Sequence, residues 1–487
     1  MPSEETAWFR QRSYAHFDFP ITKDKAIELV KDPDRVRRHA FMPLIADYVE
    51  SVSKKRTPAG KRIYEKKRRP IAYASHLDSY IYSFYAQKLN ALLEKQYAAD
   101  ELCYQAVLAY RKFPVGHSNT NIHFANDAFN EIKAQDNCIV LALDIEGFFD
   151  NLCHHRLKNA WAKLLSVSRL PHADFAVFKA ATTSSAVLRQ HLKEILKQSE
   201  VRRRRGKRNA KICDIKTFRK LIAPKLEPFQ NIITRIKKEE MRPKLNRGIP
   251  QGLPISATLA NLYMLETDIK LSNSLFNIGG VYKRYSDDIL LIVPKEHAKQ
   301  IESKVVKEID KIKLKIQKRK TQRILISKLN EKKRAYALDS QYRINNNPTR
   351  IEYLGFSFDG EQILIKNSTV TRFMMKASKA IKQSKRSALA ESRRIKCAPR
   401  LKKRKLFARL TTLGYGNAYG TIVYSDNRDN IAADTIPRLG FFEYAKRAQQ
   451  ITNSPHIARQ IVQIENQIYR LINKAEKSLQ KKWMASE

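Results

Sequence analysis

The sequence predicts an α+β fold in which an antiparallel sheet carries carboxylates at the ends of its strands. The apolar run 138–144 is typical of a buried strand, and it ends in a carboxylate. Residues 281–285 and 289–293 indicate two more short strands, joined by a tight Ser-Asp-Asp turn. Helical periodicity dominates the first hundred residues, and the C-terminal tail is predicted to be mostly helical.

Four sequence features predict particular helices. In the N-terminal part, one helix face is predicted by Leu77, Ile81, Phe84 and Tyr85. Residues 255–271 predict a helix capped by Ser256. The tail from about residue 371 is basic and helical. Its end favours an intramolecular packing seam, because apolar residues recur at spacings of four and three, at Ile457, Ile461, Ile464, Ile468, Leu471 and Ala475.

Composition narrows the classes of partner. The 487 residues include 93 Lys and Arg against 48 Asp and Glu, a formal charge of +45, which requires an anionic partner. Nucleic acid is the leading candidate and an acidic membrane surface the alternative. We expect no membrane partner, because no apolar stretch is long enough to cross a bilayer.

The cysteines and the polar N-terminus predict a cytoplasmic protein. The five cysteines form no CxxC pair, and residues 1–12 do not resemble a secretory signal. We therefore expect reduced, packed thiols without structural zinc. The basic charge is dense at 54–69, 201–211 and 376–405. The 201–211 run is open to three interpretations: a solvated loop, a nucleic-acid contact or a nuclear address.

Two carboxylate sites end apolar strands. Asp144 closes one strand, and the adjacent pair Asp287 and Asp288 lies in the predicted turn. Adjacent aspartates in an apolar hairpin repel one another, and a bound divalent cation removes that cost. Mg²⁺ suits such a site, since it needs few protein carboxylates and keeps positions for substrate phosphates. The alternative is a solvated turn whose aspartates only cap the backbone.

Five motifs in family order resemble those of reverse transcriptases. LALDIEGFFD resembles motif A, RGIPQGLPISATLAN at 247–261 motif B, and YSDD the YxDD hairpin. LKIQKRKT resembles motif D, and YLGF at 353–356 the primer-grip motif E. The resemblance covers roughly residues 62–356. It implies a right-hand polymerase with an N-terminal extension and fingers at 1–125 and a palm with an antiparallel sheet at 126–358, which includes a basic insertion near 200–211. A helical thumb and C-terminal extension would follow at 359–487.

The resemblance implies a two-metal active site. Asp144 and Asp287 would hold two Mg²⁺ ions, with Mn²⁺ as a substitute, and the carbonyl of Ile145 would be a further ligand. Asp288 would support the site more than it ligates. Lys320 corresponds to the motif D lysine, a general acid for pyrophosphate, although a solvated charged face is the competing interpretation.

The resemblance also implies contacts with nucleotide, template and primer. Phe149 would lie beneath the sugar and exclude a 2′-hydroxyl, and Arg69 would grip the triphosphate, a role for which Lys66, Lys67 and Arg68 compete. Gln251 and Gly252 would contact nucleotide and template, since glycine permits close backbone approach. Arg111 would lie near the template. The primer-grip residues would be Tyr353, Leu354 and Gly355. The adjacent His154 and His155 are expected to be structural, because neighbouring helical residues do not share a face.

The implied function is RNA-directed DNA polymerisation, with an RNA template, deoxynucleoside triphosphates and a DNA product. The basic helical C-terminus resembles the defence-associated and abortive-infection reverse transcriptases of prokaryotes best, some of which use a dedicated non-coding RNA or form homo-oligomers. Retron and group II intron enzymes are the related alternatives. A non-catalytic RNA-binding scaffold is disfavoured by the intact aspartates, and an RNA-dependent RNA polymerase by Phe149.

Overall fold

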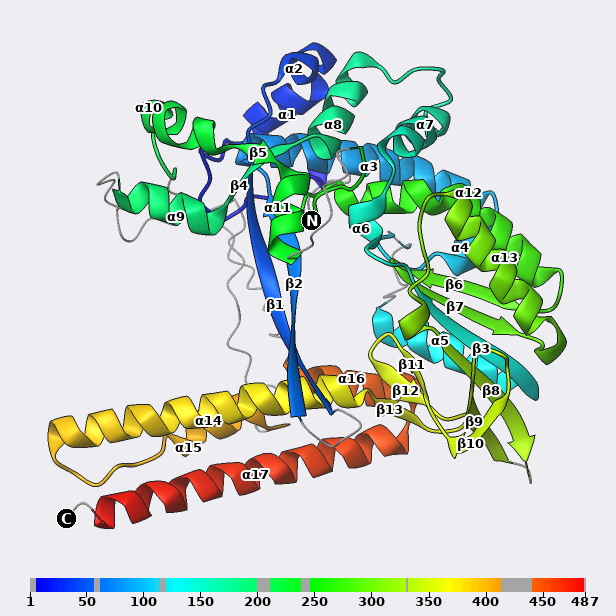
Figure 1. The fold of residues 1–487 in the computed structure, drawn as a ribbon. Helices are drawn as coiled ribbons and strands as arrows, with labels where there is room; N and C mark the ends of the chain where they lie inside the picture. The colour runs from blue at the N-terminus through cyan, green and yellow to red at the C-terminus, as the bar shows by residue number, and fades with distance from the viewer. Residues whose placement is uncertain are drawn as a thin grey trace. The chain divides into compact units, whose positions relative to one another are not determined.

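The computed structural model describes residues 6–56, 62–111, 113, 120–198, 211–237, 246–329, 332–412 and 440–485 (Figure 1). The chain divides into two compact units, each built from two separate stretches. The first unit is Met1–Lys112 with Leu143–Thr321, and the second is Phe113–Ala142 with Gln322–Glu487. Both units combine helices with sheets, which confirms the mixed class predicted from the sequence. The boundaries predicted for fingers, palm and thumb stay predictions.

A long β-hairpin begins the sheet of the first unit. β1 (Leu44–Arg56) pairs antiparallel with β2 (Arg62–Tyr73), and the strand order continues through β4 (Ser185–Leu188) to β5 (Glu227–Pro228). The expectation that helix dominates the first hundred residues is wrong for this stretch. Leu44 to Ala46 are buried, but Val49 and Val52 farther along are exposed, so the ribbon has no alternating burial pattern. Its Lys, Arg and Glu residues also have good helix propensity, which obscures the strands.

Helices make up most of the rest of the first unit. The predicted apolar face near Ile81 is part of α3 (His76–Ala98), whose N-terminus is capped by the Ser75 hydroxyl. The remaining helices are α1 (Lys23–Lys31), α2 (Pro33–Arg38), α4 (Glu101–Ala106), α6 (Phe148–Asn151), α7 (His154–Leu164), α8 (His172–Thr182), α9 (Arg189–Gln198), α10 (Ile215–Thr217), α11 (Phe229–Lys237), α12 (Ser256–Phe276) and α13 (Ala298–Lys311). The short π-helix η2 (Phe218–Ile222) and the short 3₁₀ helices η3 (Ala223–Lys225), η4 (Lys295–His297) and η5 (Lys318–Lys320) also belong to this unit.

The predicted strands around the carboxylates are present. β3 (Asn137–Asp144) begins in the second unit and ends in the first, and β6 (Val281–Tyr285) pairs antiparallel with β7 (Asp288–Val293). Helix α12 is confirmed, but the predicted cap is wrong. The Ser256 hydroxyl donates to the carbonyl of Pro250 at 2.6 Å, where a cap would accept from the helix.

The second unit contains two sheets and the C-terminal helices. Residues 137–142 of β3 pair antiparallel with β8 (Gln322–Leu329), followed by β9 (Lys332–Leu338) and β10 (Ile344–Pro348). A smaller antiparallel sheet contains β11 (Ile351–Tyr353), β12 (Phe356–Phe358) and β13 (Ile363–Ile365). The helices are α5 (Asn121–Ala134), α14 (Asn367–Ile395), α15 (Lys403–Leu410), α16 (Phe441–Thr452) and α17 (Pro455–Met484).

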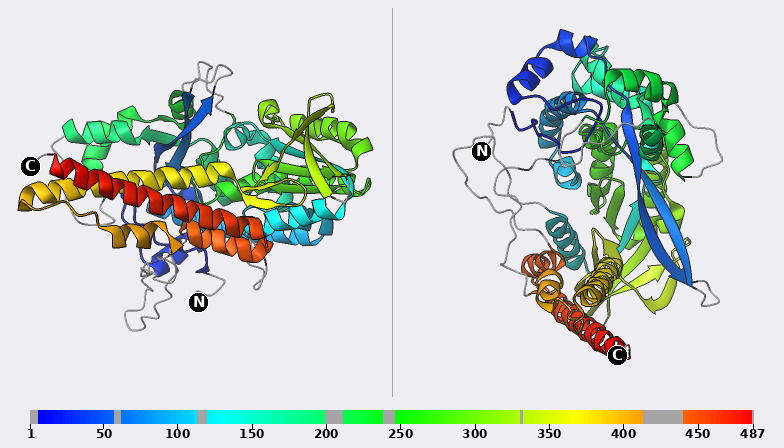
Figure 2. Two further views of the ribbon diagram at one scale, coloured as in Figure 1. Left: turned by 90° about the horizontal axis from the view of Figure 1, so that it is seen from below. Right: turned by 90° about the vertical axis from the view of Figure 1, so that its left-hand side faces the viewer.

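The predicted C-terminal packing seam is the buried face of α17. Figure 2 shows α17 running beside α14, and α17 also contacts α15, α16 and β13. The seam is therefore intramolecular, as predicted. Its C-terminal part differs from the prediction, because Ile472 is buried where Leu471 and Ala475 are only partly buried. The buried seam is Ile457, Ile461, Ile464, Ile468, Ile472 and Leu479.

The helices and the cysteines bear on the predictions about a membrane and about disulfides. Among the residues that the structure describes, no helix is both long and apolar enough to span a bilayer. All five cysteines are free thiols, and four of them are buried, with Cys397 exposed. Burial raises the pKa of the Cys138 thiol to about 12, so this side chain is an unreactive packing group.

Replacing Ile468 by Ala should destabilise the second unit by about 2–5 kcal/mol, because it leaves a cavity in a close-packed helix seam. Val462, on the exposed side of α17, is the control, and V462A should change stability by no more than about 0.5 kcal/mol. Thermal unfolding of the full chain measures both. Equal shifts in the two variants would contradict the assignment of the seam.

Candidate active site

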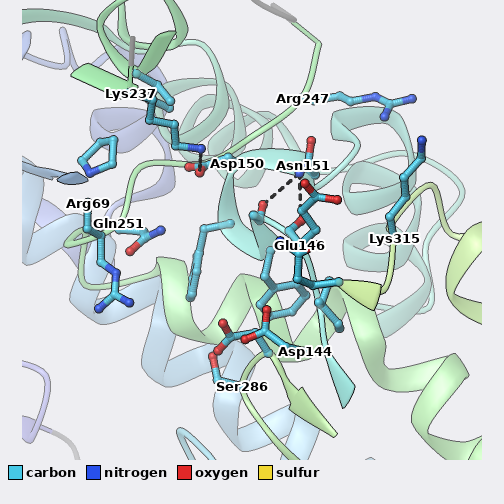
Figure 3. A pocket seen from close by; sticks show the side chains of 18 of the residues that line it. Arg69, Asp144, Glu146, Asp150, Asn151, Lys237, Arg247, Gln251, Ser286 and Lys315 are labelled. Atoms are coloured by element: carbon cyan, nitrogen blue, oxygen red, sulfur yellow. Dashed lines mark hydrogen bonds and ion pairs between the residues drawn. The ribbon is translucent and has the colours of Figure 1, made fainter. Parts of the chain in front are cut away.

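A pocket of about 580 Å³ brings together three of the four predicted catalytic residues, Asp144, Asp287 and Lys320 (Figure 3). Its lining comes entirely from the first unit. Figure 3 shows Asp144 and Ser286 close to one another, with Arg69 and Gln251 on one side and Arg247 on the other. The lining includes eight basic and four acidic residues, so the pocket suits a ligand with several negative charges.

A backbone hydrogen bond joins the two carboxylate-bearing segments. The N–H of Ile145, directly after Asp144, donates to the carbonyl of Asp287 at 3.0 Å. Asp144 ends β3, and Asp287 is the second residue of the tight turn between β6 and β7. Both aspartates line the pocket and are partly buried. Two strands that are distant in the sequence thus present their carboxylates at one place.

The motif D segment lies against the motif A segment. Gln317 N–H donates to the carbonyl of Asp144 at 2.7 Å, and Glu146 N–H donates to the carbonyl of Lys315 at 2.8 Å. This pairing brings Lys320 to Asp144, where its ammonium contacts both carboxylate oxygens at 2.7 and 2.8 Å. The Asp144 carboxylate therefore binds a cationic group in the structure.

The donor atoms of this site fit Mg²⁺. The carboxylates of Asp144 and Asp287 are hard oxygen donors, and Ile145, whose carbonyl is the third predicted ligand, also lines the pocket. Within the described residues, no group of three or more His, Cys, Asp or Glu side chains is arranged to hold a metal. Mg²⁺ suits two carboxylates because it retains water and phosphate ligands, whereas structural zinc needs a fuller protein shell.

Asp288 lies apart from the pocket lining. It is the first residue of β7, pairs with Tyr285 and is exposed. Successive side chains of a strand point to opposite faces, which separates Asp288 from Asp287. The structure therefore places Asp288 where a supporting role is easier to accommodate than metal ligation.

A left-handed glycine brings Phe149 into the pocket. Gly147 has φ +53° and is the N-cap residue directly before α6, the short helix that carries Phe149. The carbonyl of Phe149 accepts a hydrogen bond from Ile249 N–H at 2.9 Å, so motif A and motif B are joined at this residue. Phe149 is half-buried and lines the pocket, while Phe148 is buried and packs edge-on against it at 5.5 Å. Phe148 is thus a core side chain, whereas Phe149 is more exposed to the pocket, and its role as a gate stays a prediction.

The motif B loop is attached to strand β2. Ala72 N–H donates to the carbonyl of Gln251 at 2.8 Å, and Gln251 lines the pocket. Gly252 has φ +111°, and a Cβ added to it would lie 2.4 Å from the carbonyl oxygen of Ala72. Gly252 is not in the pocket lining. The close approach found for this glycine is thus an approach to β2, and the predicted contact with nucleotide and template stays a prediction.

Arg69 is distinguished from its basic neighbours on β2. Arg68 pairs with Glu50 at 3.2 Å and lies over the Tyr48 ring, and Lys66 also contacts Glu50, at 3.8 Å. Within the described part of the chain, Arg69 has no ion-pair partner, and it is exposed to the pocket. Arg69 is therefore the arginine of this group best placed for an anionic ligand.

Arg111 does not have the role predicted from the sequence. Its guanidinium is 1% exposed, pairs with Glu94 at 2.7 Å, donates to backbone carbonyls and lies between the rings of Tyr97 and Tyr104. This side chain fixes the end of α4 in place of the predicted template contact. Its burial could not be predicted locally, because an Arg-Lys pair shortly before a proline is typical of a surface loop.

His154 and the primer-grip motif lie outside the pocket. His154 is buried and forms a 2.7 Å hydrogen bond with the Gly248 carbonyl, which supports the predicted structural role, and burial lowers its pKa. YLGF lies in the second unit, at the turn between β11 and β12, where Leu354 and Gly355 both have positive φ. Asn121 holds this turn by donating to the Leu354 carbonyl at 3.0 Å. The primer contact of Tyr353, Leu354 and Gly355 stays a prediction.

Sequence reasoning missed several pocket residues. Lys237 pairs with Asp150 at 2.7 Å across the pocket wall, and Tyr110 forms a 3.1 Å hydrogen bond with the Ser286 hydroxyl. Arg247 and Lys315 also line the pocket. Arg247 lies next to the GIPQG segment and Lys315 lies inside LKIQKRKT, so the motifs could have indicated both residues. No motif indicated Lys237, because the sequence between it and motif B follows no recognisable pattern. The basic run 201–210 lies outside the described residues.

Residues 207–358 match the family described as reverse transcriptase (RNA-dependent DNA polymerase). The matched stretch contains Gln251, Asp287 and Lys320, and it ends shortly after YLGF, whereas Asp144 precedes it. The chain therefore contains a reverse transcriptase domain, which is an RNA-directed DNA polymerase domain. A search of curated proteins found no match.

Solved telomerase structures are similar to this chain. One is apo telomerase from Candida tropicalis truncated from its C-terminal domain, with 9% identity and a TM-score of 0.37, covering 71% of this chain and 61% of that one. Another is telomerase from Candida albicans in complex with a TWJ fragment of telomeric RNA, with 14% identity and a TM-score of 0.34, covering 73% of this chain and 53% of that one. The alignments thus span just over half of these telomerases.

Replacing Gly252 by Ala should lower stability by about 1–3 kcal/mol and reduce polymerase activity, since the new Cβ must push the Gln251 loop away from β2. Gly279 is the matched control, because it also has positive φ but nothing lies within 4 Å of the place that a Cβ would take there. Thermal unfolding and primer extension compare G252A with G279A. Equal activity in the two variants would contradict the docking role of Gly252.

Proposed function

We propose that this chain extends a primer on an RNA template by adding deoxynucleotides, through two-metal nucleotidyl transfer. The observation that carries the proposal is the Ile145–Asp287 hydrogen bond, because it fixes Asp144 and Asp287 at one end of a strongly basic pocket. Phe149, Gln251 and Arg69 line the same pocket. These are the residue types needed for a sugar, a base and a triphosphate.

The metals would be held by Asp144, Asp287 and the Ile145 carbonyl. The proposed ion is Mg²⁺, with Mn²⁺ as a substitute. Two such ions would lower the pKa of the primer 3′-hydroxyl and neutralise the leaving pyrophosphate. When the Asp144 carboxylate binds a metal in place of Lys320, the ammonium group of Lys320 would be released. Lys320 then lies beside the pocket with protons on Nζ to donate to a phosphate oxygen, which supports its proposed role as general acid.

The other pocket residues bind and select the nucleotide. Arg69 offers the planar fork that suits bidentate contact with a triphosphate. Gln251 lies on the loop attached to β2, where it can contact the nucleotide. The ring of Phe149 leaves no room beneath the sugar for a 2′-oxygen. This selection favours deoxynucleotides and disfavours an RNA-synthesising enzyme.

Template and primer binding is proposed for the second unit and for the fingers. YLGF would hold the primer terminus, and the basic helix α14 would follow the phosphate backbone as part of a thumb at 359–487. The corresponding proposals for 1–125 and 126–358 are fingers and palm. The +45 charge supports many phosphate contacts, which do not depend on base sequence.

The proposed biological setting is cytoplasmic antiphage defence in a prokaryote, with an associated non-coding RNA. It is supported by the long basic helical segment after motif E, which resembles that of defence-associated reverse transcriptases. Retron and group II intron types are the alternatives, and a homo-oligomer fits any of them. Sequencing the nucleic acid that co-purifies with the protein, before and after RNase treatment, separates these settings.

Asp144→Asn and Asp287→Asn should each reduce deoxynucleotide incorporation by at least about a hundredfold, because each removes a charged metal ligand. The assay is extension of oligo(dT) on poly(rA) with Mg²⁺. Asp136→Asn is the matched control, since Asp136 is 76% exposed and outside the pocket. Thermal unfolding checks that all three variants are folded. Undiminished incorporation by D144N or D287N would refute the two-metal assignment.

Phe149→Val should raise ribonucleotide incorporation relative to deoxynucleotide incorporation by about tenfold or more, because it opens space beneath the sugar. The ratio of kcat/KM for UTP and dTTP on the same primer–template measures this selectivity. Phe175→Val is the control, because Phe175 is exposed and lies outside the pocket. An unchanged ratio in F149V would show that another residue is the gate.

A further inference from the structure

The turn that carries Asp287 has an unfavourable backbone conformation. Ser286 has φ +61°, in the left-handed region that residues other than Gly, Asn and Asp rarely adopt. Such a conformation persists only when surrounding contacts hold it. Two contacts are made to Ser286 itself. Arg284 Nη1 donates to its carbonyl at 3.1 Å, and the Tyr110 hydroxyl shares a 3.1 Å hydrogen bond with its hydroxyl.

Arg284 is itself rigidly held. It is fully buried, and its Nε and Nη2 donate to the two carboxylate oxygens of Asp268 at 2.7 and 2.6 Å. Nη2 also donates to the side-chain oxygen of Asn261 at 3.2 Å. Burial alone would lower the pKa of Arg284, but the charge of Asp268 raises it above its ordinary value, so the guanidinium stays charged. All three nitrogens of the guanidinium thus donate to named acceptors.

The partners of Arg284 belong to the motif B helix. Asn261 and Asp268 are seven residues apart on α12 and therefore lie on one face of it. Asn261 Nδ2 donates to the Ala109 carbonyl at 2.9 Å, and Leu108 N–H donates to the Arg284 carbonyl at 2.9 Å. The network thus connects α12, the segment before Tyr110 and the turn with Asp287.

Stability alone does not account for this ion pair. A buried ion pair can often be replaced by apolar residues of similar volume without loss of stability. Apolar replacements cannot supply the N–H that Arg284 gives to the Ser286 carbonyl. That bond acts on the peptide group that directly precedes Asp287, so it bears on the orientation of the Asp287 carboxylate.

We infer that Arg284 is a positioning residue for the metal site: anchored by Asp268, it holds the Ser286 peptide so that the Asp287 carboxylate faces Asp144. This inference rests on the proposed function, because it takes Asp287 as a metal ligand. Groups that orient a ligand from behind typically change metal affinity by about 10–100-fold when they are removed.

The test measures Mn²⁺ binding to the full chain by electron paramagnetic resonance, without nucleotide or primer. The double variant Arg284→Met with Asp268→Leu removes the ion pair and leaves no unpaired buried charge. Arg284→Lys keeps the charge but cannot contact both Asp268 and the Ser286 carbonyl. Tyr282→Phe is the matched control. The Tyr282 hydroxyl donates at 2.8 Å to Asp268 Oδ1, the oxygen that also accepts from Arg284 Nε, but it makes no hydrogen bond to Ser286.

We expect Mn²⁺ binding to be weaker by about tenfold or more in the double variant and in R284K. The thermal midpoints of these two variants need not be lowered to the same extent. Y282F should lower the thermal midpoint and leave Mn²⁺ affinity within about twofold of the wild type. The inference is overturned if either Arg284 variant that folds binds Mn²⁺ like the wild type, or if Y282F weakens binding by the same factor. Asp287→Asn is measured in parallel. Mn²⁺ binding by D287N that equals the wild type would overturn the proposed metal assignment itself, a result distinct from the other two.

Discussion

The hydrogen bond from Ile145 N–H to the Asp287 carbonyl is the constraint on which the rest of the site depends. The two aspartates belong to segments more than a hundred residues apart in the sequence. Asp287 provides the acceptor of this bond, and Asp144 directly precedes its donor. Bringing carboxylates together is unfavourable without a cation. The backbone bond does not depend on charge, so it can hold the geometry before any cation binds. The site is thereby preorganised, so that the proposed metal ions would bind without reordering the chain.

The other pocket segments are fixed in the same manner, through the backbone. Ala72 holds the Gln251 carbonyl, Gln317 holds the Asp144 carbonyl, and Ile249 holds the Phe149 carbonyl. A backbone contact is insensitive to most side-chain substitutions, but it fails where a Cβ intrudes, as at Gly252. Side chains that face the pocket are therefore free to specialise in chemistry. The exception is the buried Arg284, a side chain that holds the backbone itself by donating to the Ser286 carbonyl.

The elements predicted correctly from the sequence are those whose information is local. β3 and the β6–β7 hairpin are continuous apolar patterns with turn residues at their ends, so their predicted bounds agree with the structure to within one residue. The start of α12 is predicted equally well, but the helix continues to Phe276, past its predicted end at residue 271. The β1–β2 hairpin was missed because much of it is exposed, and strand pairing there overrides helix propensity. Arg111 lies in the predicted region but makes another contact, and the approach of Gly252 to Ala72 is not foreseen. In both cases the partner, Glu94 or Ala72, lies in another element that no local pattern specifies.

Positive charge has two separate uses in the first unit, and the residue types differ accordingly. Arg284 is buried and needs a fixed planar fork, since it contacts Asp268, Asn261 and a carbonyl at the same time. Lys320 is half-exposed and pairs with the carboxylate of Asp144, which a flexible ammonium can leave. The buried arginine therefore determines where the Asp287 carboxylate lies, whereas the exposed lysine can follow the charge of the ligand. A lysine in the buried position would leave a carbonyl without its donor, and an arginine at position 320 would hold Asp144 more firmly against a metal.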